Sequence, residues 1–356
     1  MATIRKLRGK HQAMVRRSGY PQQSKVFKTK KLAEEWARDI ESKMDRGVFM
    51  DQTNAKHTTF DDLIERYLTE VTNKKRKEKP KEVDTCVIRR IQRENRALCE
   101  LTIDKLKPRH FEAYRDTRLG TLTHCMRNEN GTLRNIAAST VVRELSLLHS
   151  IIEHRFIDLG LPYNPVSGKY VKRPTVNNKR DVRLSEEDMK RLIEACYRVR
   201  NHLIGPFLEI GFETGARRGE ILSLLWDDVK LENKSALFRD VKNTRSPDNI
   251  INRDIGLSPH AIEVLKKLPQ DEERVFPMSA NAFRLSFSRI RKNLDMMYFR
   301  FHDTRHEFIS RMVEIGMPVH LIMAQVGHTS TRSLQRYMTI QPSVLADEIE
   351  MRLLAA

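Results

Sequence analysis

The chain has 356 residues, and 65 lysines and arginines against 47 aspartates and glutamates give it a formal charge of +18. This length predicts two or three domains, and the charge favours nucleic acid as a partner over an anionic membrane surface. No apolar run reaches the roughly 18 residues of a membrane span, and the basic N-terminus lacks the apolar stretch of a secretory signal. The four cysteines lack zinc-ligand spacing, so buried free thiols in a reducing cytoplasm are expected.

Residues 1–50 are predicted to form a small unit of three strands and one helix. Strands are expected over Thr3–Arg8, Gln12–Arg17 and Ser24–Lys28, with glycine-containing turns after the first two. Thr29 is the candidate cap of a helix over Lys30–Asp45. Apolar residues recur in this helix at helical spacing, namely Leu32, Trp36, Ile40 and Met44.

A helical domain is predicted from 57 to 165, after a linker at 51–56. Its third apolar stripe begins after Ser139, a candidate helix cap. The basic run at 74–79 reads as a solvated loop or as a contact to a phosphate strand, and 120–134 reads as an inserted loop or hairpin. The three apolar stripes are Phe60, Leu63, Ile64, Tyr67 and Leu68; Val87, Ile88 and Ile91; and Val141, Leu145, Leu148, Ile151 and Ile152.

A second linker is expected at 162–179, where proline, asparagine and lysine are frequent and periodicity is weak. A helix is predicted to start at Ser185, which is followed by acidic residues that suit a first turn. Two alternating stretches, Ala236–Asp240 and Ile250–Ile255, predict a hairpin whose turn begins with Lys242.

Five residues of the C-terminal half have the chemistry needed to attack a phosphodiester without a metal. Arginine binds two phosphate oxygens at once, histidine exchanges a proton near neutral pH, and tyrosine can act as a covalent nucleophile. His302 and Arg305 are spaced to share one face of a helix, and Gly327 is placed to end a helix just before the second histidine. Ser330 is the candidate cap of the helix with the tyrosine. The five residues are Arg217, His302, Arg305, His328 and Tyr337.

The order and spacing of these residues resemble the tyrosine recombinases of the phage integrase family. The similarity is strongest over 180–345, it extends to 59–165 through the stretch Ser139–Leu145, and the N-terminal pattern is similar to the arm-type DNA-binding domain of some integrases. The resemblance implies a multidomain, mainly α protein. It would comprise a β3-α arm-type domain at 1–50, a helical core-binding domain at 57–165, and a mixed α+β catalytic domain with a small sheet at 175–356.

The resemblance also implies a role for each site residue. Tyr337 would form a 3′-phosphotyrosyl bond, while Arg217 and Arg305 hold the non-bridging oxygens. His302 would assist proton removal or bind the phosphate, and His328 would donate to a non-bridging oxygen. The remaining implied residues are the general acid Lys242, with Arg245 as the alternative, and Glu220, which would orient Arg217. No metal, ATP or other cofactor is required.

The implied partner is double-stranded DNA with core-type and arm-type sites, bound by a homotetramer with DNA-bending and directionality factors. The implied activity is integration or excision of a phage or mobile element in the bacterial cytoplasm, at the nucleoid. Alternatives are a DNA inversion enzyme, a type IB-like topoisomerase and a catalytically silent DNA-binding regulator. An amphipathic tail at 344–354 would pack on a neighbour or on its own domain. The expected DNA contacts are Arg5, Lys6, Arg8, Lys10, Arg16, Arg17, Lys74, Lys75, Arg76, Lys77 and Arg143.

Overall fold

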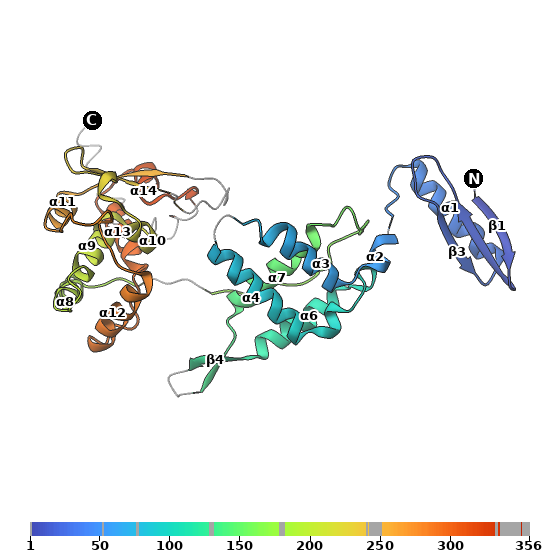
Figure 1. Cartoon of the computed structure of the whole chain (residues 1–356), viewed down its shortest axis with the longest axis horizontal. Helices are drawn as coiled ribbons and strands as arrows, with labels where there is room; N and C mark the ends of the chain where they lie inside the picture. The colour runs from blue at the N-terminus through green and yellow to red at the C-terminus, as the bar shows by residue number, and fades with distance from the viewer. Residues whose placement is uncertain are drawn as a thin grey trace. The chain divides into compact units, whose positions relative to one another are not determined.

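The computed structural model describes residues 2–51, 53–75, 78–127, 132–177, 182–239, 241, 251–331, 334 and 350, without the side chains of 124–127. The chain divides into two compact units, residues 1–178 and 179–356. The described part is mainly helical, with small antiparallel sheets (Figure 1), which confirms the predicted fold class. None of its helices has the length and apolar character needed to cross a membrane.

The N-terminal part is a three-stranded sheet with one helix on one face. The strands are ordered β1-β2-β3 and antiparallel, and Ala13 and Val15 of β2 are buried together with Ala33 and Ala37 of the helix. The Thr29 hydroxyl caps the helix as predicted. Leu32, however, is 48% exposed, because the buried face centres on the two alanines. The elements are β1 (Ala2–Leu7), β2 (Lys10–Val15), β3 (Gln23–Phe27) and α1 (Lys30–Asp45).

The helical part packs α3, α4, α6 and α7 around one apolar core. The three predicted stripes line this core, with Val87 partly buried at its margin. The predicted insertion is a hairpin of β4 and β5. The elements are α2 (Thr53–His57), α3 (Phe60–Tyr67), the π-helix η1 (Leu68–Thr72), α4 (Glu78–Glu94), α5 (Arg96–Cys99), η2 (Ile103–Lys105), α6 (Pro108–Gly120), β4 (Leu122–Arg127), β5 (Leu133–Asn135) and α7 (Ala138–Glu153).

Several local expectations in this unit were wrong. Ser139 does not cap α7, because the helix already begins at Ala138. The linker at 51–56 is partly helical, since α2 buries Ala55 in the helical core. The second linker is shorter than expected, because Val166 and Val171 also belong to that core. Cys86 is exposed, whereas Cys99 and Cys196 are buried free thiols.

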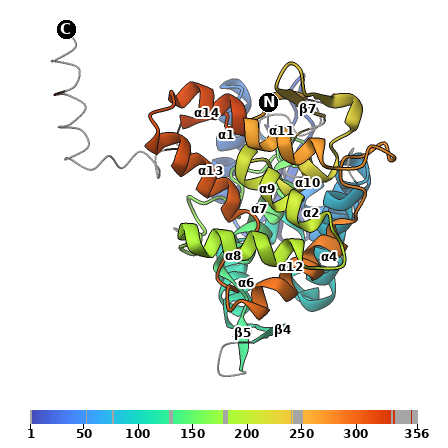
Figure 2. The ribbon, with the colours of Figure 1, turned by 90° about the vertical axis from the view of Figure 1, so that its left-hand side faces the viewer.

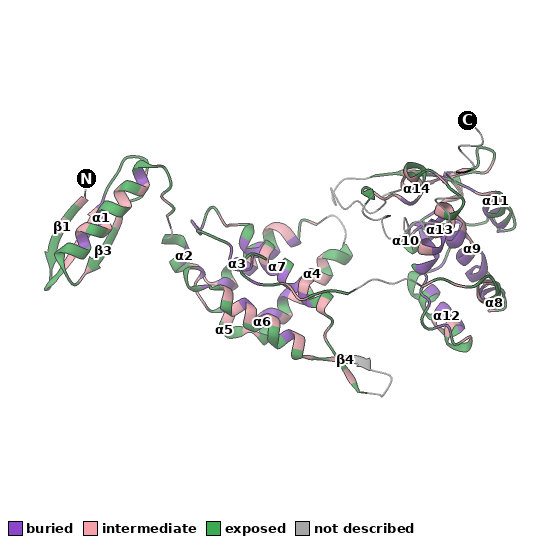
Figure 3. Ribbon diagram, turned by 180° about the vertical axis from the view of Figure 1, so that it is seen from behind, coloured by how far each residue is buried: buried purple, intermediate pink, exposed green. Residues whose placement is uncertain are grey.

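The C-terminal unit is organised around α9, which contacts α8, α10, α11, α12 and α13 (Figure 2). Most of α9 is buried, as the purple ribbon in Figure 3 shows. A sheet ordered β6-β7-β8 lies in the same unit. The elements are α8 (Glu186–Tyr197), α9 (Ile204–Thr214), α10 (Arg218–Leu222), η3 (Trp226–Asp228), β6 (Val229–Lys230), β7 (Ser235–Phe238), β8 (Arg253–Gly256), α11 (Pro259–Lys266), α12 (Ala280–Asn293), α13 (Asp303–Glu314) and α14 (Val319–Val326).

The start of α8 and the end of α14 agree with the sequence predictions. The Ser185 hydroxyl accepts the N–H of Asp188 at 3.1 Å and so caps α8. Gly327 ends α14 in the left-handed conformation. The predicted hairpin is formed by β7 and β8, which pair Phe238 with Arg253. Its turn, with Lys242, lies outside the described residues.

Candidate active site

Arg217 follows a turn that requires a glycine. α9 ends at Thr214, and Gly215 adopts the left-handed conformation with φ +61°. A Cβ atom on Gly215 would also lie 2.6 Å from Cδ1 of Phe308 on α13. Both the backbone conformation and the packing therefore select glycine. Arg217 follows after Ala216 in extended conformation and immediately precedes α10.

Arg305 joins the C-terminal ends of two helices. It lies in the first turn of α13 and is 2% exposed. Its Nη1 donates to the carbonyl of Gly215 at 2.9 Å, and its Nη2 donates to the carbonyl of Val326 at 2.5 Å. Carbonyls at helix C-termini carry partial negative charge that favours a buried cation. This guanidinium thereby brings the segment before Arg217 close to the segment before His328.

Glu220, within α10, accepts two hydrogen bonds from Arg217. The backbone N–H of Arg217 donates to Oε2 at 2.9 Å, and its Nη1 donates to Oε1 at 2.8 Å. The Glu220 side chain is 6% exposed. Burial alone would raise its pKa, but the charge of Arg253 and the bonds from Arg217 lower the pKa below the ordinary value. Glu220 is thus a charged anchor with two arginine partners.

Arg253 is a member of this cluster that the sequence did not predict. It lies on β8, its side chain is 10% exposed, and its Nη2 donates to Oε2 of Glu220 at 2.7 Å. Its Nη1 donates to the carbonyl of Val326 at 2.9 Å, the same carbonyl that Arg305 binds. A Cβ on Gly327 would lie 2.0 Å from this Nη1. Strand alternation could have marked Arg253 as inward-facing, but no local motif singles it out.

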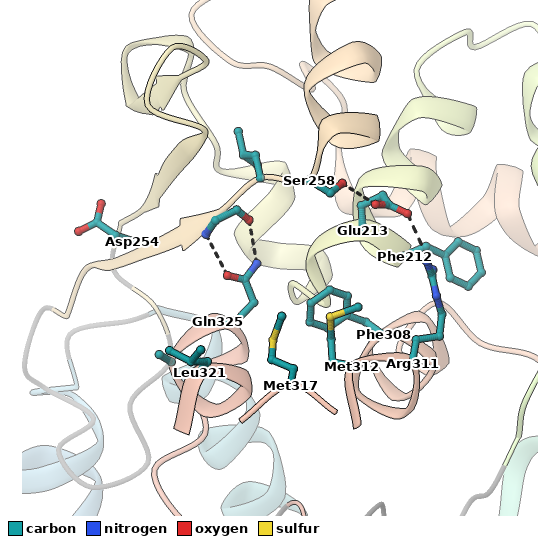
Figure 4. A pocket seen from close by; sticks show the side chains of 13 residues that line it. Phe212, Glu213, Asp254, Ser258, Phe308, Arg311, Met312, Met317, Leu321 and Gln325 are labelled. Carbon is teal, nitrogen blue, oxygen red and sulfur yellow. Dashed lines mark hydrogen bonds and ion pairs between the residues drawn. The ribbon is translucent and has the colours of Figure 1, made fainter. Parts of the chain in front are cut away.

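A side-chain amide fixes α14 to β8 (Figure 4). Nε2 of Gln325 donates to the carbonyl of Gly256 at 2.9 Å, and the N–H of Gly256 donates to its Oε1 at 2.9 Å. These bonds lie at a pocket of about 450 Å³ with walls from α9, β8, α13 and α14. The joint holds the end of α14, and therefore His328, against the strand that carries Arg253.

The two histidines sit in a positively charged environment. Burial lowers the pKa of His302, and His306, Arg305 and Arg217 lower it further. Burial also lowers the pKa of His328, to about 4, with added repulsion from Arg305, Arg217 and Arg253. Both imidazoles are therefore neutral at pH 7. Nδ1 of His328 is buried and has no hydrogen-bond partner among the described residues.

The structure thus brings together four of the six predicted catalytic residues, namely Arg217, His302, Arg305 and His328. Lys242 and Tyr337 lie outside the described residues, as do Arg245, most of the helix that was expected after Ser330, and most of the tail at 344–354. Among the described residues, no group of three or more His, Cys, Asp or Glu side chains is arranged to hold a metal ion.

The predicted N-terminal DNA contacts are divided between surfaces. Arg5 is opposite Gln12 in the sheet and donates to its side-chain oxygen at 2.8 Å, on the face away from α1. Arg17 instead pairs with Asp45 at the end of α1. Arg8 lies in the turn between β1 and β2 with φ +45°. Lys6, Arg8, Lys10 and Arg16 are exposed.

Two of the predicted contacts of the helical part, Lys75 and Arg143, meet at one carboxylate. Lys75 forms an ion pair with Asp84, and Nη2 of Arg143 lies 3.7 Å from Oδ1 of the same residue. Lys74 is exposed next to Lys75. Arg76 and Lys77 lie outside the described residues. Lys75 and Arg143, far apart in sequence, therefore lie on either side of Asp84.

The chain matches a known protein family and has similar relatives. Residues 182–343 match the phage integrase family. A Haemophilus influenzae integrase/recombinase is 28% identical over 352 residues, which cover 94% of this chain and 86% of that protein. The shufflon-specific DNA recombinase of Escherichia coli is 31% identical over 253 residues, covering 70% of this chain and 62% of that protein.

A solved structure extends the likeness to the fold. The lambda integrase tetramer bound to a Holliday junction matches with a TM-score of 0.56 at 17% identity, covering 92% of this chain and 95% of that chain. At this identity the match supports the multidomain, mainly helical fold. The family match shows that residues 182–343 belong to the phage integrase family, and the sequence relatives make the whole chain similar to tyrosine recombinases, which are site-specific DNA recombinases.

Proposed function

We propose that this recombinase cuts and rejoins DNA through a 3′-phosphotyrosyl bond to Tyr337, and that it integrates or excises a phage or other mobile element. The observation that carries the proposal is the convergence of Arg217, His302, Arg305 and His328 on the ends of α9 and α14. Both histidines have lowered pKa values to which these arginines contribute. The cluster therefore has the positive potential that attracts a phosphodiester.

The arginines would stabilise the transition state. Arg217 and Arg305 would hold the non-bridging oxygens, on which negative charge gathers as the nucleophile attacks. One such donor is worth about 10²–10³ in rate. Arg217 is oriented by Glu220, which is held in turn by Arg253. This preorganisation reduces the rearrangement needed when DNA binds.

The chemical step exchanges one phosphate ester for another. The Oη of Tyr337 forms a bond to phosphorus while the bond from phosphorus to the 5′-oxygen breaks. The phenol proton leaves with the help of His302, and Lys242 donates a proton to the departing 5′-oxygen. His328, neutral at pH 7, donates a hydrogen bond to a non-bridging oxygen. A 5′-hydroxyl of a second duplex then attacks the phosphotyrosine and releases Tyr337, so no bond energy is lost and no ATP is consumed.

The proposed partner is double-stranded DNA bound by four copies of the chain. Two duplexes that are each cut on both strands require four active sites. The lambda integrase structure with a similar fold is a tetramer on a Holliday junction, which supports this assembly. Residues 1–50 would bind arm-type sites, 57–165 would bind core-type sites, and 175–356 would carry the chemistry. DNA-bending and directionality factors would select the direction of the reaction.

DNA inversion is the second candidate function. The relative with 31% identity is a shufflon-specific recombinase, and inversion uses the same chemistry on two sites within one molecule. The two functions differ in the arrangement of the sites. A substrate plasmid with two sites in inverted orientation would be inverted by an inversion enzyme, whereas an integrase would join sites on separate molecules.

Covalent trapping tests the proposed chemistry. Full-length protein is incubated in EDTA with duplexes from the flanks of its own gene, each nicked near the candidate crossover. We expect a denaturation-resistant protein–DNA complex that is lost in Tyr337→Phe, while that variant still binds DNA. A complex that persists in Tyr337→Phe would show that another residue is the nucleophile. Tight binding without any complex would support a catalytically silent regulator.

A further inference from the structure

His302 also lines a second concave site. This pocket of about 370 Å³ lies between α10, α12 and the segment that leads into α13. Buried phenylalanines form its apolar wall, and four arginines give it positive charge. We call it the arginine pocket, after Arg218, Arg284, Arg291 and Arg300.

The arginine pocket has an unusual charge balance. In the described part of the chain, none of its four guanidiniums forms an ion pair with a carboxylate. Arg284 donates to the amide oxygen of Asn281 at 2.8 and 3.1 Å, and Arg291 donates to the carbonyl of Phe299 at 2.5 Å. By contrast, Arg217, Arg239 and Arg253 in the same unit each bind an acidic side chain. Four neighbouring cations, none of them bound to a carboxylate in the described part of the chain, repel one another unless an anion binds among them.

Arg291 shows how the apolar wall adds to this effect. Its guanidinium carbon lies 5.1 Å from the ring centroid of Phe287. Its Nε is buried and has no partner in the described part of the chain. Burial lowers the pKa of Arg291, and repulsion from Arg300 lowers it further, although Asp303 partly offsets both. An anion in the pocket would relieve this repulsion and act in surroundings of low dielectric, where its attraction is strong.

We propose that the arginine pocket binds a backbone phosphate of the DNA other than the one that is cut. This inference rests on the proposed function. Guanidinium forks match the oxygens of a phosphate, and protein–DNA complexes direct most of their polar contacts to the backbone. Arg218, Arg284 and Arg300 are exposed, so a polymer can reach them.

The place of this phosphate along the strand follows from one shared residue and one sequence neighbour. His302 belongs both to the candidate active site and to the arginine pocket. Arg218 follows Arg217 directly in the chain. A phosphate in the arginine pocket must therefore be close in the strand to the scissile phosphate. Its binding would fix the position of the DNA so that the correct phosphodiester faces Arg217 and Arg305.

Binding measurements on the full-length chain test this inference. The variants are Arg284→Gln, Arg300→Gln and their combination, titrated with a fluorescent duplex from the flanks of the gene over a series of salt concentrations. We expect each single change to weaken binding roughly tenfold. This is the lower end of the loss expected when a hydrogen bond to a charged group is removed. The plot of log K against log salt should become shallower by about 0.9 in the double variant, the value for one phosphate contact.

The matched control is Arg289→Gln. Arg289 is an exposed residue of the same helix, α12, but it lines a different pocket. Its loss removes the same charge and should leave the salt slope unchanged. If Arg289→Gln weakens binding as much as Arg284→Gln, the effect is one of general charge and the inference is wrong. Wild-type affinity and slope in the double variant would also refute it.

Neutral methylphosphonates identify the phosphate itself. Each phosphate near the cleavage point is replaced singly, and binding of the wild type and the double variant is compared. At the position that the pocket binds, the methylphosphonate should weaken binding of the wild type. It should change binding of the double variant little, because the substitutions and the methylphosphonate remove the same contact. Equal losses for both proteins at every position would refute the inference.

The outcome is separable from that of the proposed chemistry. A covalent complex that depends on Tyr337, together with unchanged binding by the double variant, would uphold the chemistry and refute the arginine pocket. A salt slope reduced in the double variant, without a covalent complex in the wild type, would uphold the pocket and refute the chemistry.

Discussion

Replacing Arg253 with methionine tests whether this residue holds Glu220, and with it Arg217, next to the end of α14. Methionine preserves much of the side-chain length but removes the bonds to Glu220 and to the carbonyl of Val326. Arg253 belongs to neither the Arg217 nor the Arg305 motif. If the contacts are as described, its loss should affect both the stability of the C-terminal unit and the orientation of Arg217.

The stability effect can be worked out from the contacts. The Arg253 and Glu220 side chains are 10% and 6% exposed, so water screens their 2.7 Å ion pair only weakly. Removing one partner of a buried pair costs about 3–5 kcal/mol, because the other charge remains buried. Glu220 keeps its two bonds from Arg217, and the carbonyl of Val326 keeps its bond from Arg305. We therefore expect the lower end, about 3 kcal/mol.

Urea unfolding followed by fluorescence measures this change in the relevant unit. The chain has two tryptophans, Trp36 and Trp226. In a Trp36→Phe background the signal reports on Trp226 alone, and so on the C-terminal unit. The rate of covalent complex formation is measured on the same proteins. We expect it to fall by up to about 10²-fold, as a small misplacement of a catalytic group can cause, with a smaller loss of DNA affinity.

Arg239→Met is the control for this substitution. Arg239 also pairs with a buried carboxylate, Asp228, but its own side chain is 56% exposed. A pair with an exposed partner should contribute about 1 kcal/mol or less, and Arg239 does not contact the cluster. Equal losses of stability in Arg253→Met and Arg239→Met, or an unchanged covalent rate in Arg253→Met, would refute the reasoning.

Two further predictions concern Gly327 and His328, at the end of α14. Gly327→Ala should destabilise the C-terminal unit by about 1–3 kcal/mol, because φ is +69° and the new Cβ would meet Nη1 of Arg253; an unchanged urea midpoint would contradict this. The folded state lowers the pKa of His328 from 6.5 to about 4. Its contribution to stability is therefore full above about pH 6.5 and is lost as the pH falls toward 4, because the unfolded chain takes up the proton first. The urea midpoint of Trp226 fluorescence should fall between about pH 7 and pH 5, and should fall less in His328→Gln; equal falls would contradict the assignment.

Local signals in the sequence determined the element boundaries well. A helix start depends on a side chain and an N–H three residues away, so Thr29 and Ser185 predicted α1 and α8. A helix end depends on one residue that tolerates positive φ, so Gly327 predicted the end of α14. The prediction that Ser139 caps α7 was wrong, because the helix begins at Ala138 and a capping residue type alone does not identify the first turn.

The order of Arg217, His302, Arg305 and His328 was also readable from the sequence, because each residue lies in a short motif. Arg253 was not readable in this way. Its partners are 33 and 73 residues distant, and nothing near it in the chain differs from an ordinary strand. The arginine pocket likewise combines α10, α12 and the start of α13. Motifs of a few residues were enough to predict which residues would carry the chemistry, whereas tertiary structure decided which distant charges meet, since burial and pairing exist only once the chain has packed.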